Sequence, residues 1–284
     1  MPVFALTTLV MLAFAANSLL NRAALLGGEM DPATFALIRV AAGAVTLLGM
    51  VALRNSLRVT RANWGAVSAL TAYLLGFSFA YLTMDAGVGA LILFGGVQVT
   101  MFAGAVYEGE PVPRRRWIGM FVSLLGLIML LWPSGGLMIS PLGFLLMSIA
   151  ALGWGLYSLI GRGVSDPLSA TAWNFTYAIP MVALGWGIAP GDVAVSHTGI
   201  WLAILSGAVT SGLGYALWYS VLPRLGASIG ALAQLSVPVL AIGLGALLLG
   251  EGVAPKTLLA ALLVLAGIWL GTKKNFRPHG KSQT

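Results

Sequence analysis

The stretch Ala86–Gly126, AGVGALILFGGVQVTMFAGAVYEGEPVPRRRWIGMFVSLLG, decides the fold, because Ala227–Gly267, ASIGALAQLSVPVLAIGLGALLLGEGVAPKTLLAALLVLAG, repeats it 141 residues later. Small residues and the Gly-Glu pair fall at equivalent positions in the two stretches. The identical pairs include Ala86 and Ala227, Gly89 and Gly230, Ala90 and Ala231, Ala105 and Ala246, Gly109 and Gly250, Glu110 and Glu251, Val112 and Val253, and Gly126 and Gly267.

The repeat extends toward the N-terminal side of both stretches. Ser18-Leu19 with Arg22 parallels Ser158-Leu159 with Arg162, and Asp31-Pro32 parallels Asp166-Pro167. Self-similarity of this extent indicates internal duplication. We therefore divide the chain into a first half, residues 1–137, and a second half, residues 138–284.

The composition is that of a membrane protein. Hydrophobic residues make up 59% of the chain and charged residues 8%, whereas soluble domains carry about 25% charged residues. Apolar runs of ~20 residues recur, which is long enough for a helix to cross a hydrocarbon core of about 30 Å. We expect an all-α membrane protein.

Turn residues between the apolar runs predict ten transmembrane helices, five in each half. Because five is odd, the second half enters the membrane in the opposite sense, which gives two inverted five-helix repeats. The predicted spans are 3–26, 32–53, 63–84, 86–107, 115–132, 141–161, 168–189, 199–221, 227–249 and 256–271.

The basic residues predict the orientation. If both termini are cytoplasmic, only Arg22 and Lys256 fall in outer loops, while Arg39 lies within the second span. This asymmetry follows the positive-inside rule. It predicts a multi-pass protein of the cell inner membrane with a short basic cytoplasmic tail from 272. The residues on the cytoplasmic side are Arg54, Arg58, Arg61, Arg114, Arg115, Arg116, Arg162, Arg224, Lys273, Lys274, Arg277 and Lys281.

Several functional classes fit poorly. The net charge of +7 is spread over short loops, so we expect no nucleic acid partner. The chain has no Cys, which excludes disulfides and Cys-based zinc sites, and we expect no metal or cofactor. No His or Asp falls near the predicted midplane, so the chain lacks the groups of an intramembrane protease and is not expected to be an enzyme. A channel would need rings of charge or carbonyls, and no ring of charge is visible in the sequence.

Inverted repeats instead favour a transporter with a midplane site that opens to each side in turn. Since one chain holds both halves, we expect a monomer.

Shorter motifs point to one family. They are Ala15-Ala16-Asn17-Ser18, Asp31-Pro32 followed by Ile38-Arg39-Val40, Gly109-Glu110, Gly250-Glu251, Leu125-Gly126, Ala266-Gly267 and Pro238. In these the chain resembles the drug/metabolite transporter superfamily, in its ten-helix EamA-type branch. Within that branch it is similar to bacterial exporters of aromatic and other neutral amino acids. Val97 departs from the pattern, because it stands where the second half has Pro238.

The resemblance implies an exporter of small metabolites that works by alternating access through a central cavity. Polar and aromatic residues at the predicted midplane are the substrate-binding candidates, because an amide or hydroxyl facing lipid would lack a partner. Aromatic rings could stack on an apolar side chain, and the amides could bond an amino-acid carboxylate or amine. Helix packing is the alternative role for each. The candidates are Asn17, Tyr73, Phe77, Gln98, Trp154, Tyr157, Tyr215 and Gln234. Trp218 and Tyr219 are expected at the membrane interface.

Four residues are candidates for gating or structure. Arg39 is expected to bond backbone carbonyls or an acid at a helix end, with substrate contact as the alternative. Pro238 could bend its helix during gating or fix a static kink. Glu110 and Glu251 are expected to act as helix-end hinges or contacts between repeats. Without a midplane carboxylate, facilitated diffusion is expected; the alternative is a proton-coupled drug or metabolite exporter that titrates one of these glutamates.

Overall fold

The computed structural model describes residues 2–54, 58–131, 140–188 and 195–272, and in these ranges the chain is helical apart from its connections and one isolated bridge. The segments are α1 (Val3–Leu25), η1 (Leu26–Gly28), α2 (Pro32–Leu53), α3 (Trp64–Ala80), α4 (Ala86–Tyr107), α5 (Arg114–Leu131), α6 (Pro141–Arg162), α7 (Pro167–Ile188), α8 (His197–Leu205), η2 (Ser206–Leu213), α9 (Gly214–Leu225), α10 (Ala227–Gln234), α11 (Ser236–Leu248) and α12 (Pro255–Thr272).

Within the described ranges, seven helical segments are long and apolar enough to cross a membrane: Val3–Leu25, Pro32–Leu53, Ala86–Tyr107, Pro141–Arg162, His197–Leu225, Ala227–Leu248 and Pro255–Thr272. Helix α3 is a shorter apolar helix. The prediction of an all-helical, multi-pass membrane protein is confirmed for these residues. The number of ten spans, their inversion and the side of the termini stay predictions, and the basic tail beyond Thr272 lies outside the described residues.

Side chains just before several helices explain where the helices begin. The Asp31 carboxylate accepts a hydrogen bond from the Thr34 amide at 2.9 Å, and Pro32 occupies the first helical position. Asn63 and Ser196 accept in the same way from Ala66 and Gly199. Such caps bond the backbone N–H groups of the first helical turn, which have no partner within the helix. Proline lacks a backbone N–H, so it costs little stability at the first helical position, where that N–H would be unpaired.

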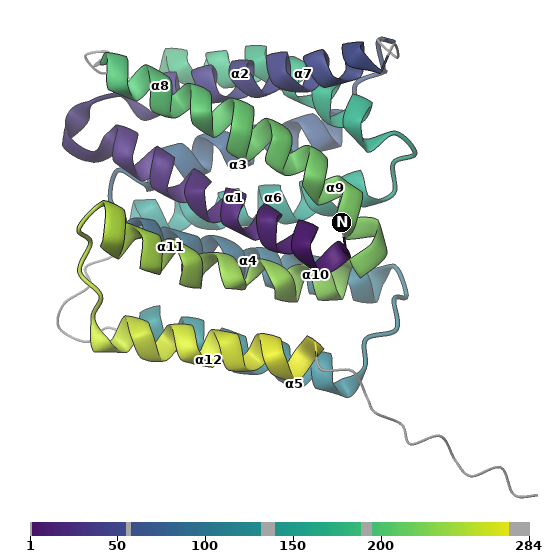
Figure 1. The fold of residues 1–284 in the computed structure, drawn as a ribbon, viewed down its shortest axis with the longest axis vertical. Helices are drawn as coiled ribbons and strands as arrows, with labels where there is room; N and C mark the ends of the chain where they lie inside the picture. Colours follow the sequence, from purple (N-terminus) through teal and green to yellow (C-terminus); the bar gives the residue numbers. More distant parts are fainter. Residues whose placement is uncertain (1, 55–57, 132–139, 189–194, 273–284) are drawn as a thin grey trace, which may run out of the picture.

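The helices run side by side, with α2 and α7 at one end of the molecule and α5 and α12 at the other (Figure 1). Helix α4 lies in the middle, where it packs against α6, α10 and α11, and most of its residues are buried. Helices α3 and α6 pack together, as do α1 and α8. Helices from both halves therefore enclose the centre.

Helices α5 and α12 approach closely through small residues. A Cβ placed on Gly119 would lie 2.5 Å from the Gly267 carbonyl oxygen. One on Gly126 would lie 2.9 Å from the carbonyl oxygen of Ala260. Close packing at glycine is a common source of attraction between helices in lipid, where burial of apolar surface gains little.

The two Gly-Glu pairs make equivalent corners. Gly109 and Gly250 end α4 and α11 with φ of +71° and +67°, a left-handed conformation that glycine adopts without strain. The Glu110 carboxylate then accepts from the amide of Ala227 at 2.9 Å, and Glu251 accepts from that of Ala86 at 3.0 Å. Each glutamate thus caps the first residue of a helix in the other half.

Candidate substrate-binding site

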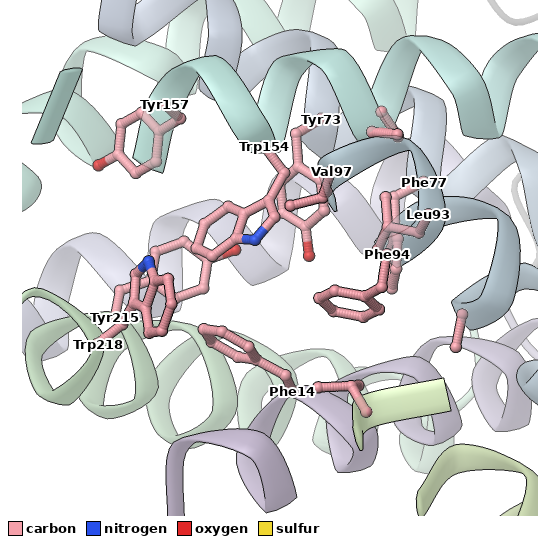
Figure 2. Packing of buried hydrophobic residues seen from close by; sticks show 14 of the residues in the cluster. Phe14, Tyr73, Phe77, Leu93, Phe94, Val97, Trp154, Tyr157, Tyr215 and Trp218 are labelled. Atoms are coloured by element: carbon pink, nitrogen blue, oxygen red, sulfur yellow. The ribbon is translucent and has the colours of Figure 1, made fainter. Parts of the chain in front are cut away.

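Four aromatic rings meet at the centre of the molecule. Phe14 on α1, Tyr73 on α3, Trp154 on α6 and Tyr215 on α9 form what we call the aromatic cluster, and all four are buried. The Trp154 ring centroid lies 4.6 Å from that of Tyr215 and 5.3 Å from those of Phe14 and Tyr73. Figure 2 shows these rings facing one another from different helices. Both halves of the chain contribute to this cluster.

Arg39 on α2 lies against the aromatic cluster and is fully buried. Its Nη2 donates to the hydroxyls of Tyr73 at 2.8 Å and Tyr215 at 3.3 Å, and its Nε donates to Ser211 Oγ at 2.9 Å. The expectation of backbone carbonyls or an acid was wrong. The carbonyls are engaged within their own helices, and hydroxyls from α3, η2 and α9 reach the guanidinium at this depth.

The Arg39 guanidinium also lies over two rings. Its carbon is 5.1 Å from the centroids of both Tyr73 and Phe77, within the range of a cation–π interaction. The Phe77 ring in turn contacts that of Tyr73, with the centroids 5.2 Å apart, and meets that of Tyr81 edge to face at 4.8 Å. The structure therefore joins Phe77 to the aromatic cluster through the cation.

The two candidate amides are already bonded to neighbouring helices. Asn17 donates to the Tyr73 hydroxyl at 3.2 Å, and its oxygen accepts from Ser206 at 2.7 Å and Thr210 at 3.0 Å. The oxygen of Gln234 accepts from the Trp154 indole at 2.6 Å. These contacts favour the alternative role of both amides, which is to hold helices and rings in place.

Gln98 buries both of its amide atoms without a hydrogen-bond partner among the described residues. Buried groups of this kind are rare in proteins and call for an explanation, such as a ligand or water. The Tyr157 hydroxyl lies beside the side chains of Thr171 and Asn174, which can bond it. Gln98 is therefore the candidate whose polar groups remain available.

A cavity of about 550 Å³, which we call the vestibule, adjoins the site. It lies between the ends of α6 and α9 and the starts of α3 and α7, and its polar lining includes Arg58, Arg61, Asp166 and Asn174. Tyr157 and Tyr219 also line it. The Tyr157 ring is 6.3 Å from that of Tyr215, so Tyr157 and Tyr215 stand between the vestibule and Arg39.

The opposite side of the molecule is closed at the equivalent place. Met30 forms an antiparallel bridge with Val195, and the Ser196 amide donates to the Glu29 carbonyl at 2.9 Å. Met30 is buried against Ala24, Phe35 and Ala203. Ser165, which precedes Asp166-Pro167 as Met30 precedes Asp31-Pro32, instead lines the vestibule. The site is thus nearer to solvent on the vestibule side.

Trp218 and Tyr219 lie in the interior, so the prediction of an interfacial position was wrong. Trp218 donates to Ser158 Oγ at 3.3 Å, and Tyr219 donates to the Tyr157 carbonyl at 2.9 Å. Both residues follow Tyr215 by about one helical turn, so the same face of α9 turns all three toward α6.

The gating candidates sit at helix ends and at a helix break. Glu110 forms ion pairs with Arg116 at 3.4 Å and Arg162 at 3.0 Å, while Glu251 lies 3.7 Å from Arg22. Pro238 follows the break at Leu235 that separates α10 from α11. Proline cannot donate to the carbonyl four residues back, and with Val97 at the equivalent position α4 continues unbroken. Their role in gating stays a prediction.

Sequence reasoning missed two residues of the site, Phe14 and Ser211. Phe14 lies three residues before Asn17 and Ser211 four residues before Tyr215, spacings that place each pair on one helix face. That spacing was the available signal. Among the described residues, no group of three or more His, Cys, Asp or Glu could hold a metal ion.

The fold defines a multi-pass helical membrane protein with a buried polar and aromatic site. The EamA-like transporter family profile matches residues 141–272. One relative, the uncharacterized protein PA1977 of Pseudomonas aeruginosa, is 47% identical over 93% of this chain and 92% of its own length. The chain belongs to the EamA-like transporter family, within the drug/metabolite transporter superfamily.

More distant relatives carry functional names. Probable amino-acid metabolite efflux pumps of Salmonella typhimurium and Escherichia coli are 26% and 25% identical. The matches cover 66% and 71% of this chain, and 67% and 73% of the relatives. A solved crystal structure covers 94% of this chain and 96% of its own with a TM-score of 0.71 at 19% identity, which shows the similarity of the fold.

Proposed function

We propose that this protein exports small metabolites, above all aromatic and other neutral amino acids, by alternating access through the aromatic cluster. The observation that carries the proposal is a buried set of rings and polar groups contributed by both halves of a membrane transporter. Aromatic faces bind apolar side chains and ammonium groups alike. The names of the two distant efflux pumps support the export of amino-acid metabolites in general.

The proposed architecture is ten transmembrane helices in two inverted repeats, working as a monomer in the inner membrane. Equivalent contacts support the inversion: Glu110 caps the start of α10, and Glu251 caps the start of α4. Packing of α3 on α6 has its counterpart in packing of α1 on α8. Since the aromatic cluster takes residues from both halves, one chain is sufficient to build it.

The proposed conformation is inward-facing. Arg58 and Arg61 line the vestibule, and basic loops are cytoplasmic by the positive-inside rule. The bridge between Met30 and Val195 then closes the outer side. Substrate would enter from the cytoplasm, pass Tyr157, and leave after the two sides exchange their open and closed states.

Facilitated diffusion is the proposed mode, because none of the described carboxylates forms an ion pair with Arg39, the charged residue beside the aromatic cluster. One observation favours the alternative, a proton-coupled exporter of drugs or metabolites. Partial burial raises the pKa of Glu251 above its usual range, and a carboxyl group that titrates more easily can carry a proton.

Purified protein in liposomes tests both forms of the proposal. With labelled phenylalanine, tryptophan, alanine, a nucleoside and a quaternary amine, we expect flux of the amino acids that stops when their concentrations are equal on the two sides. Imposing a pH gradient should not change this end point. Accumulation driven by the pH gradient and lost in Glu251→Gln would establish the proton-coupled exporter, and flux of the amine or nucleoside alone would refute amino-acid transport.

A further inference from the structure

We propose that Arg39 is the anion-binding element of the site and takes the carboxylate of the transported molecule. The inference rests on the proposed function and narrows it, because it names the chemical group that the protein recognises. A carboxylate would have to accept from the amide nitrogens of Asn17 and Gln234, and these already donate to the Tyr73 hydroxyl and to Met101 Sδ. A carboxylate therefore needs a different partner, and Arg39 offers one.

The charge of Arg39 has no counter-ion in the described structure. A guanidinium keeps its proton in proteins, so burial does not neutralise it. The described acids are engaged elsewhere or lie at the membrane ends, and none forms an ion pair with Arg39. They are Glu29, Asp31, Asp85, Glu108, Glu110, Asp166 and Glu251. A buried, unpaired cation is costly in a protein interior, and an arriving anion would remove that cost.

The guanidinium also keeps donors free. Its three hydrogen bonds to described residues all go to neutral hydroxyls, those of Ser211, Tyr73 and Tyr215. The terminal nitrogen Nη1 has no partner among the described residues, although it is buried. Hydroxyls can rotate, and Arg binds carboxylates through two parallel donors. The guanidinium is therefore held by three hydroxyls and keeps one terminal nitrogen without a hydrogen-bond partner.

The surroundings of Arg39 suit a carboxylate joined to an apolar group. Tyr73 lies beside the guanidinium and 5.3 Å from the Trp154 ring. A molecule with its carboxylate at Arg39 would place its remaining atoms against the aromatic cluster. It would reach the site from the vestibule after Tyr157 moves, since Tyr157 lines that cavity and stacks toward Tyr215.

Binding of two matched probes to the purified full-length protein tests the inference. The probes are 3-phenylpropionate and its amide, which differ in charge and share the ring. Tryptophan fluorescence and the thermal unfolding midpoint in detergent report binding. We expect the wild type to bind the acid about ten-fold or more tightly than the amide, as a charged hydrogen bond predicts. Arg39→Gln should bring the ratio to about one, and Arg39→Lys should keep part of the preference.

Ser78→Ala is the matched control. It removes a buried hydrogen bond to Asn21 and leaves Arg39 in place, so the ratio of acid to amide should equal that of the wild type. Equal wild-type affinity for both probes, or no binding of the acid, would overturn the inference even if Arg39→Gln cannot be purified. Arg39-dependent binding without amino-acid flux would refute the proposed function alone. Flux of phenylalanine that phenylalaninamide inhibits as strongly as unlabelled phenylalanine would refute the carboxylate site alone.

Discussion

Trp154 connects the aromatic rings of the site to one of its amide side chains. Its ring packs on Phe14, Tyr73 and Tyr215, and its indole N–H donates to Gln234 at 2.6 Å. The hydrogen bond fixes the orientation of the ring, and the ring forms a wall of the aromatic cluster. Substitutions can separate these two contributions.

Trp154→Phe should lower the free energy of unfolding by about 1–3 kcal/mol, because it leaves the Gln234 oxygen without its donor. Trp154→Ala should cost about 3–5 kcal/mol, since it also opens a cavity. Trp154→Ala should further reduce flux of phenylalanine relative to alanine by roughly two- to ten-fold, the range expected for lost aromatic contact. Denaturant titration in mixed micelles and liposome flux give the two readouts.

Trp201→Phe is the control, because Trp201 is 65% exposed and lies outside the aromatic cluster. It should leave both quantities within experimental error of the wild type. An unchanged ratio of phenylalanine to alanine flux in well-folded Trp154→Ala would assign Trp154 to packing.

Residue types could be predicted from the sequence, but their partners could not. Arg39 stood out because a charge within an apolar span is rare. Its hydroxyl partners come from residues 73, 211 and 215 on three other segments, and no local pattern links these positions. Trp218 and Tyr219 show the converse error, since a membrane-end position in sequence does not tell which helix face is covered.

At the scale of helices, the Gly-Glu corners have a testable electrostatic consequence. Burial disfavours the charged form of Glu251 and raises its pKa above the ordinary 4.5, although the Ala86 amide and Arg22 oppose the shift. As the pH falls, the folded protein therefore takes up this proton before the unfolded chain does. Between the raised pKa of the folded protein and the ordinary pKa, the free energy of unfolding of the wild type should increase relative to that of Glu251→Gln. The increase should be complete below the ordinary pKa.

Thermal unfolding midpoints of the wild type and Glu251→Gln, measured between about pH 4 and about pH 8 in detergent, check this. The midpoint of the wild type minus that of Glu251→Gln should rise as the pH falls. Glu29→Gln, at an exposed residue, should follow the wild-type curve. Parallel curves for wild type and Glu251→Gln would contradict the shift.

Helix ends were the most predictable part of the fold, and helix continuity was less so. Asp31-Pro32 and Asp166-Pro167 mark starts that a capping side chain and a proline both favour. The π-helical segment η2, between α8 and α9, carries no such signal. Its residues pack against α1 and α2, so its geometry depends on tertiary contacts.

At the scale of the whole molecule, equivalent places in the two halves differ: Met30 and Val195 form a bridge on one side, and the vestibule separates the corresponding segments on the other. Antiparallel bridge partners have Cα atoms about 4.5–5.5 Å apart, within the range of a disulfide. Met30→Cys with Val195→Cys should therefore oxidise readily and stop transport, and a reductant should restore it. The native chain has no Cys, so the effect can be attributed to this pair.

Ala62→Cys with Ser165→Cys is the equivalent pair on the vestibule side. It should cross-link more slowly, because closing the vestibule must come first, and the cross-link should also stop transport. Each single Cys variant is the control. Undiminished flux through fully oxidised protein of either pair would exclude alternating access.

The proposed orientation predicts which side each loop faces. In right-side-out vesicles, an impermeant thiol reagent should label His197→Cys and should reach Arg58→Cys only after the membrane is permeabilised. Both positions are exposed, and the basic loop that contains Arg58 should be cytoplasmic. Labelling of both positions in sealed vesicles, or the reverse order, would contradict the proposed topology.

The reciprocal caps set an order of events during synthesis. The amide of Ala86 is capped by a residue 165 positions later in the chain, and a ribosome adds about 5–20 residues per second. For roughly ten to thirty seconds, the start of α4 is therefore made while Glu251 does not yet exist. The nascent first half must wait in the bilayer with that amide uncapped. Stalling translation before codon 251 should leave a chain that membrane quality-control proteases degrade faster than one stalled just after α11 and its glutamate have emerged.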